Sequence, residues 1–195
     1  MTSLAECIIA IEGALDVADI PHAFGGALAL AFHIEEPRGT RDIDVNVFVN
    51  ADRVVEVFRA LPSAVAWDDA DVAMVRGDGQ VRLFWDDTPI DLFFATHAFH
   101  DVAQLHVDRV PFAGIMMPVL GATELVVFKA FFDRTKDWAD IEAIVEAQTA
   151  DLPGAVCCRV ERSGPCDRRI APLGAGRRQG RWGAQPTRRG EASAG

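Results

Sequence analysis

Residues 42–49 read Asp-Ile-Asp-Val-Asn-Val-Phe-Val, and polar and apolar side chains alternate from Asp42 to Val47. Alternation with a period of two is typical of a β-strand that has one polar and one apolar face. Because residues two apart on a strand point to the same side, Asp42 and Asp44 are expected to stand next to each other. Adjacent carboxylates repel each other unless a cation neutralises them. The stretch alone leaves two interpretations open, a solvated strand face and a site for a hard cation such as Mg²⁺.

Upstream of this strand, a short apolar run ends in the pair Gly25-Gly26, and residues 27–34 form a breaker-free stretch that predicts a helix. Glycines between a strand and a helix let the backbone approach a phosphate closely. The helix N-terminus that follows offers unpaired N–H groups and the positive end of a dipole. The other interpretation of the pair is an ordinary turn.

Downstream, residues 80–85 and 90–95 predict two strands joined by Asp86-Asp87-Thr88-Pro89, a turn-forming sequence. Asp91 stands in the second of these strands with apolar neighbours on both sides. A carboxylate in an apolar strand needs a partner, because burying an unpaired charge is costly. Asp91 is therefore either a satisfied structural residue or a functional one.

The remaining pattern fills in an α+β or α/β domain. A capping box at Ser3 predicts a first helix from residue 4 to before Pro21. Residues 115–120 are interpreted as an apolar connection. Further helices are expected over residues 52–61, 97–106, 123–132 and 137–147. We expect a core over residues 1–121, C-terminal helices packed on it over residues 122–150, and a tail over residues 151–195.

Charge divides the chain of 195 residues unevenly. Its formal net charge of −10 combines −16 on residues 1–155 with +6 on residues 156–195. The acidic body argues against a broad phosphate-tracking surface. The basic tail, rich in Arg, Gly and Pro, has too few apolar residues to fold alone and is expected to be disordered; it fits either a functional basic arm or translation in a shifted frame. Without a signal peptide, an apolar run of membrane-spanning length or a cysteine framework, the chain is expected to be cytoplasmic, with no membrane partner.

Taken together, the glycine pair, the paired acids and the later acid occur in an order that resembles the nucleotidyltransferase fold of the DNA polymerase β type. More narrowly, Phe-Gly-Gly-Ala-Leu-Ala at residues 24–29 and Arg-Gly-Thr-Arg-Asp-Ile-Asp at residues 38–44 look like the AbiEii-type toxins, which include the MenT-type transferases. Residues 124–129 and 134–141 are similar to that family's helical Lys motif and its Lys/Arg-Asp-x-x-Asp motif. The resemblance covers about residues 20–148 and implies a mixed sheet flanked by helices, but the chain is short for an AbiEii protein.

The resemblance also implies roles for individual residues. The metal-binding and catalytic acids would be Asp42, Asp44 and Asp91, which would hold a Mg²⁺ pair, with Asp91 on the ion that activates the acceptor hydroxyl. Lys129 would contact phosphate as a further catalytic residue. The nucleotide-binding set would be Gly25, Gly26, Thr40, Arg41, Lys129 and Asp137. In the same reading, Asp137 and Asp140 share one helix face and orient Lys129 or the acceptor.

The function implied by the resemblance is Mg²⁺-dependent transfer of a nucleotide from an NTP to a nucleic-acid 3′ hydroxyl, with tRNA favoured. The chain would act as the toxin of a toxin–antitoxin system, and a cognate antitoxin protein would be its partner. Two alternatives stay open at this point. One is nucleotidyl transfer to a small molecule or to a protein hydroxyl, and the other is a catalytically inactive binding module with the same fold.

Overall fold

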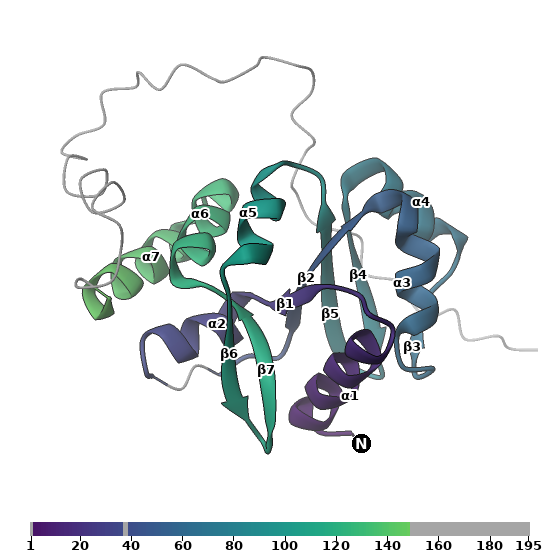
Figure 1. The fold of residues 1–195 in the computed structure, drawn as a ribbon, viewed down its shortest axis with the longest axis horizontal. Helices are drawn as coiled ribbons and strands as arrows, with labels where there is room; N and C mark the ends of the chain where they lie inside the picture. The colour runs from purple at the N-terminus through teal and green to yellow at the C-terminus, as the bar shows by residue number, and fades with distance from the viewer. Residues whose placement is uncertain (1, 37–38, 149–195) are drawn as a thin grey trace, which may run out of the picture. The chain divides into compact units, whose positions relative to one another are not determined.

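The computed structural model describes residues 2–36 and 39–148, and its centre is a seven-stranded sheet (Figure 1). The strands are β1 (His22–Phe24), β2 (Ile43–Asn50), β3 (Val65–Ala66), β4 (Gln80–Trp85), β5 (Thr88–Ala95), β6 (Val107–Phe112) and β7 (Ile115–Leu120). They lie in the order β3-β4-β5-β2-β1-β7-β6. The pairs β2–β5 and β1–β7 are parallel and the other neighbours are antiparallel, so the sheet is mixed.

Seven α-helices in the described residues accompany the sheet. They are α1 (Leu4–Val17), α2 (Gly26–His33), α3 (Val54–Ala60), α4 (Asp69–Asp78), α5 (Phe99–Leu105), α6 (Ala122–Phe132) and α7 (Thr135–Ala147), and a 3-10 turn over Ala51–Arg53 leads into α3. Local sequence sets several of their ends. Ser3 and Glu6 form the expected capping box at the start of α1. Asp68 and Asp71 form another at the start of α4, which ends at Gly79 in the left-handed conformation.

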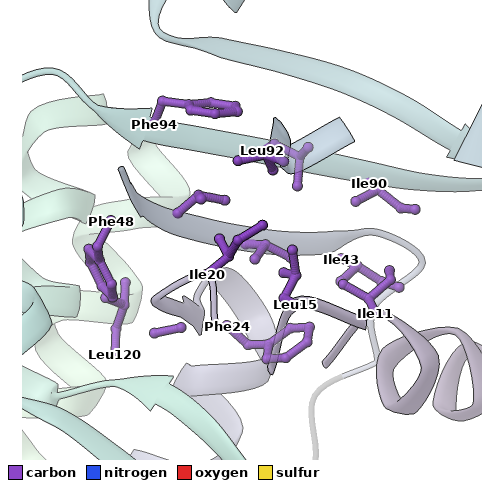
Figure 2. Packing of buried hydrophobic residues seen from close by; sticks show 14 of the residues in the cluster. Ile11, Leu15, Ile20, Phe24, Ile43, Phe48, Ile90, Leu92, Phe94 and Leu120 are labelled. Carbon is purple, nitrogen blue, oxygen red and sulfur yellow. The ribbon is translucent and has the colours of Figure 1, made fainter. Parts of the chain in front are cut away.

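One face of the sheet carries the hydrophobic core. Alternate residues of the two central strands, including Ile43 of β2 and Leu92 of β5, are fully buried. The apolar stripe of α1 lies against them, with Ile11 and Leu15 beside Ile43 and Phe24 (Figure 2). The helix α3 belongs to the same layer, because its Phe58 makes an edge contact with Phe94 of β5 at 6.5 Å between ring centroids.

The opposite face of the central strands is covered by the C-terminal helices. Phe93 of β5 meets Phe132 of α6 edge to face, with 5.8 Å between ring centroids. The helices α6 and α7 pack against each other and both contact α2 (Figure 1). At the far end of α2, the ring Nε2 of His33 lies 2.7 Å from the carbonyl oxygen of Leu120, which ties α2 to the end of β7.

The structure confirms the α+β class with a mixed sheet flanked by helices. The strand over residues 80–85 and the helices near 4–17, 27–34 and 123–132 are also confirmed within a few residues. Two expectations are wrong. Residues 115–120 are the strand β7 rather than a connection, and α6 is capped at Gly121 rather than at Thr123. In addition, β3, α4 and β6 were not expected at all. Arg38 and the tail from residue 149 lie outside the described residues.

The presence of Pro118 is the reason why the strand β7 was not predicted. A proline has no N–H to give to a sheet and argues against a strand. Here the pairing of β7 with β1 involves only Phe24 and Val119, so a missing donor next to it costs little. No helix among the described residues combines the length and the apolar character that crossing a membrane requires.

The core assignment predicts the effect of a truncated side chain. Leu92 of β5 is fully buried on the core face of the sheet, next to Val45 of β2. Leu92→Ala should lower the free energy of unfolding by about 2–5 kcal/mol through lost burial and the cavity left behind. Leu105→Ala is the matched control, because Leu105 is 81% exposed and its truncation should change little. Urea denaturation of the two variants measures the difference, and equal effects would contradict the assigned core.

Candidate active site

The register between β2 and β5 places two acidic side chains side by side. The strands are parallel, and Asp44 is the direct neighbour of Asp91. Ile43 and Ile90, which precede these acids, are fully buried in the core. Since side chains alternate along a strand, both carboxylates lie on the opposite face, the one on which Phe93 meets α6. The fold thus brings together two acids that are 47 positions apart in the chain.

The glycine pair brings the start of α2 directly onto Asp44. The backbone N–H of Gly25 donates to the carbonyl oxygen of Asp44 at 2.9 Å. Gly26 has a φ of +53°, and a Cβ built on it would lie 1.8 Å from Asp44 Oδ2. A residue with a side chain would therefore be strained by its backbone conformation and would collide with the carboxylate. This is the local reason why the turn needs glycine, and it sets the carboxylate at the positive end of the helix dipole.

Asp44 is the electrostatic focus of this face. Its pKa is raised to about 6, first by burial and then by the negative charges of Asp42 and Asp91. The positive charges of Lys129 and Lys136 act in the opposite direction but do not outweigh these effects. The raised pKa means that the three acids interact and that ionising Asp44 is costly in the metal-free protein.

Asp42 precedes β2 and is held by its own loop. The hydroxyl of Thr40 donates to Asp42 Oδ1 at 2.5 Å, and the backbone N–H of Asp42 donates to Thr40 Oγ1 at 3.3 Å. Thr40 therefore orients the Asp42 carboxylate. Arg41 between them is exposed to solvent.

Asp91 is bound by an arginine from the neighbouring strand. Arg82 of β4 lies opposite Asp91 in the antiparallel register. Its Nε and one terminal nitrogen donate to the two oxygens of Asp91 at 2.7 and 2.5 Å. The hydrogen bonds to Asp91 raise the pKa of Arg82, and the charges of Asp91, Asp42 and Asp44 raise it further. Arg82 is thus a cation that contacts one acid of this face and faces the other two.

A second charged group lies between α6 and α7. The ammonium of Lys129 donates to Asp140 Oδ2 at 2.8 Å and lies 3.9 Å from Asp137 Oδ1. Asp137 is fully buried and accepts two side-chain hydrogen bonds from Arg134, at 2.6 and 3.0 Å. Burial alone would raise the pKa of Asp137, but these bonds and the charges of Arg134 and Lys129 hold it below the ordinary value. The two predicted acids of α7 therefore bind the two cations.

The cations of this second group face the acidic strands. The pKa of Arg134 is raised mainly by its hydrogen bonds to Asp137 and additionally by the charge of Asp44. The guanidinium of Arg134 lies 4.8 Å from the ring centre of Phe132, which in turn packs on Phe93, two residues beyond Asp91. The α6–α7 group and the acids thus belong to one region on one side of the sheet.

Arg82 is a charged residue of this region that the sequence analysis did not single out. A four-residue turn over 86–89 would have put Phe84 opposite Asp91. In the structure β5 begins at Thr88, the turn is Asp86-Asp87, and the register shifts by two residues to bring Arg82 to that position. The sequence signal that could have identified Arg82 is the need of Asp91 for a positive partner, which the adjacent strand contains.

The carboxylates of this face are the type of ligand that a hard divalent cation requires, but their positions do not form a ready-made metal site. Carboxylate oxygens are the ligands that Mg²⁺ prefers. The pKa of Asp44 is raised first by burial and then by the negative charges of Asp42 and Asp91, so the three acids act on one another. Within residues 2–36 and 39–148, however, no three His, Cys, Asp or Glu side chains already form a metal-binding group. In this arrangement the Asp42 carboxylate is bonded to Thr40 and the Asp91 carboxylate to Arg82.

Known proteins support the fold. The chain resembles the solution structure of the antibiotic-resistance factor ANT(2″)-Ia, with a TM-score of 0.57 and 14% identity over 80% of this chain and 90% of that one. It also resembles ANT(2″)-Ia in complex with adenylyl-2″-tobramycin, with a TM-score of 0.53 and 16% identity over 80% of this chain and 98% of that one. The lincosamide antibiotic adenylyltransferase LnuA, in its lincomycin-bound form, has a TM-score of 0.53 and 10% identity over 76% of this chain and all of that one.

No family model matches the chain, and no curated protein matches it in sequence. The likeness is therefore one of structure, and it shows that the chain has the nucleotidyltransferase fold. The narrower expectation of an AbiEii-type toxin stays a prediction.

The contact between Gly26 and Asp44 predicts opposite effects for two glycine substitutions. Gly26→Ala should lower the free energy of unfolding by more than 1 kcal/mol, because the new methyl group clashes with the carboxylate at a positive φ. Gly13→Ala, in the middle of α1 with no atom within 4 Å of the added carbon, should raise it by about 0.5–1 kcal/mol. Thermal unfolding of both variants makes the comparison, and a tolerated Gly26→Ala would refute the close contact.

The raised pKa of Asp44 predicts a pH-dependent stability. A folded-state pKa of about 6 means that the metal-free native state binds a proton more tightly than the unfolded chain does. Its stability should therefore decrease as pH rises from about 4 to above 6, and Asp44→Asn should remove that decrease. At pH 8 the variant should be more stable than the wild type by about 1–3 kcal/mol, and the two should converge near pH 4. Urea denaturation in EDTA measures this, with Asp87→Asn in the exposed β4–β5 turn as the control.

Proposed function

We propose that this protein is a metal-dependent nucleotidyltransferase, which transfers a nucleotidyl group from an NTP to a hydroxyl group and releases pyrophosphate. One observation supports it above the others. Asp44 and Asp91 are neighbours on parallel strands, and the glycine-initiated α2 begins directly on Asp44. The arrangement combines a place for phosphates with adjacent carboxylates, and the fold is that of the nucleotidyltransferases.

In this proposal, Gly25 and Gly26 let the triphosphate approach the start of α2, whose N–H groups and dipole favour anions. Asp42 and Asp44 would hold the metal ions, and Asp91 would hold the one nearest the acceptor. Mg²⁺ in such a pair supplies positive charge to the attacking and leaving oxygens of an in-line displacement. Thr40 contributes by fixing the Asp42 carboxylate, and the exposed Arg41 is available to a phosphate.

The α6–α7 group would provide cations on the phosphate side. Asp137 is fully buried and both of its oxygens bond to Arg134, so its role in nucleotide binding is to hold that arginine and Lys129 in place. Lys129 is itself only 7% exposed and is bonded to Asp140. Of the cations in this group, Arg134 is the more exposed one and is oriented by two hydrogen bonds, a suitable geometry for a phosphate oxygen.

For the acceptor we propose a tRNA 3′ hydroxyl, with the protein acting as a toxin that a cognate antitoxin neutralises. The support for this finer proposal is the resemblance of residues 24–29 and 38–44 to the AbiEii-type toxins. A charge of −16 on residues 1–155 repels a polyanion at long range. Recognition would therefore depend on a single exposed RNA end rather than on an extended basic surface.

Electrostatics favours a second candidate acceptor, a small molecule. Two of the cations near the acids are engaged by carboxylates, Arg82 by Asp91 and Arg134 by Asp137, which reduces the positive charge offered to RNA. Two structurally similar proteins are an antibiotic-resistance factor solved with adenylyl-2″-tobramycin and a lincosamide adenylyltransferase solved with lincomycin. A neutral or cationic hydroxyl compound suits an acidic site better than a nucleic acid does.

The proposal predicts label transfer that requires Asp44. The protein is incubated with each α-³²P-labelled NTP, Mg²⁺ and total RNA, intact tRNA or tRNA with a blocked 3′ hydroxyl. We expect label on intact tRNA with one preferred NTP, no label on blocked tRNA, and a loss of about 100-fold or more for Asp44→Asn and in EDTA. Asp87→Asn should keep full activity. Label on an added aminoglycoside or lincosamide but not on RNA would replace the tRNA proposal with the second candidate. Label on the protein alone would point instead to a protein hydroxyl as the acceptor, and no label anywhere would refute nucleotidyl transfer.

A further inference from the structure

Arg82 is placed where a metal ion would compete with it. It comes from β4, on the opposite side of β5 from β2, and its guanidinium grips both oxygens of Asp91. The side chain of Asp91 is 17% exposed and that of Arg82 is 44% exposed, so the pair lies at the accessible edge of the acidic face. The same edge is where a cation and a substrate would enter.

The geometry of the pair restricts what Asp91 can do. A bidentate arginine uses the two carboxylate oxygens together and fixes the plane of the carboxyl group. A divalent ion on Asp91 would then share these oxygens with a fixed positive charge, at distances where like charges repel strongly outside bulk water. Binding of the ion consequently requires the guanidinium to give up one of its two hydrogen bonds or to turn away into solvent, which its exposure permits.

We propose that Arg82 is a positioning residue that occupies Asp91 in the absence of metal and weakens the binding of a metal ion that arrives without a nucleotide. An NTP brings its own negative charges, which offset the guanidinium and give it an alternative partner. Loading of the site is thereby coupled to the presence of the nucleotide. The inference rests on the proposed metal-dependent function, but it concerns cation affinity and can be tested without any acceptor.

The test is Mn²⁺ binding to the full-length protein without nucleotide, measured by the electron paramagnetic resonance signal of free Mn²⁺. Arg82→Gln keeps a hydrogen-bond donor near Asp91 but removes the charge, and it should bind Mn²⁺ about tenfold more tightly than the wild type. Arg82→Lys keeps the charge and should stay within about threefold of the wild type. With saturating NTP, and after correction for the Mn²⁺ that the nucleotide itself chelates, the difference between Arg82→Gln and the wild type should fall to less than about threefold.

Arg53→Gln is the matched control. Arg53 grips Glu56 with the same two-bond geometry, at 2.8 and 2.6 Å, but in the turn that leads into α3, in the layer that covers the opposite face of the sheet. Its removal should leave the Mn²⁺ affinity unchanged. In the background of Asp91→Asn, the gain from Arg82→Gln should fall to less than about threefold, because Arg82 acts through Asp91.

A measurement on the wild-type protein avoids dependence on the folding of any variant. In ¹⁵N spectra of arginine side chains, the Nε–H signal of Arg82 should shift when Mg²⁺ is added, while that of Arg53 should not. Mn²⁺ affinities that are equal for the wild type and Arg82→Gln, or weaker in Arg82→Gln, would overturn the role of Arg82 and leave the metal site intact. Failure of both proteins to bind Mn²⁺, even with NTP, would overturn the metal site as well.

Discussion

Asp44 Oδ2 occupies the space that a side chain on Gly26 would need. Three elements meet at this close contact. The strand β1 ends there, α2 begins there, and β2, which pairs with β1, contributes Asp44. The hydrogen bond from Gly25 to the Asp44 carbonyl extends the β1–β2 pairing up to the turn itself. Because β2 is also fixed to β5 by register, the position of Asp91 follows from the same contact. A displacement of the glycine turn would consequently move the acids as a group.

Around this contact most carboxylates have a bonded partner. Thr40 donates a hydrogen bond to Asp42, Arg82 forms an ion pair with Asp91, and Arg134 and Lys129 form ion pairs with the two acids of α7. Asp44 is the neighbour of Asp91 in the sheet, and its pKa is raised first by burial and then by the charges of Asp42 and Asp91. Burial of apolar residues on the other face of the same strands, such as Ile43 and Leu92, stabilises the sheet and offsets the repulsion among these acids.

The parts of the fold that could be predicted from sequence are those governed by local rules. Strict alternation predicted β2, a capping box predicted the start of α1, and the glycine pair predicted the turn before α2. The strands β6 and β7 were missed because each contains a proline, Pro111 and Pro118, and their pairing is settled by partners far away in the chain.

The same distinction applies to the site. The acids were singled out from their positions in the sequence, because the residue types and strand periods carry that information. Their partners were not all predictable. The contact between Arg82 and Asp91 depends on whether the hairpin turn has two residues or four, and a shift of two residues keeps every side chain on the same face, so the hydrophobic pattern does not distinguish the alternatives.

The pairing of β1 with β7 has a consequence for how the protein matures. Phe24 finds its partner Val119 only after about 95 further residues have been made, and the cations of α6 and α7 follow later still. During synthesis, the glycine turn and the acids of β2 and β5 therefore leave the ribosome well before the elements that complete their surroundings. A chain interrupted before α7 would contain all three acids and yet lack the buried Asp137 that holds Arg134 and Lys129. The assembled site is a late product of translation, present in finished chains and missing from unfinished ones.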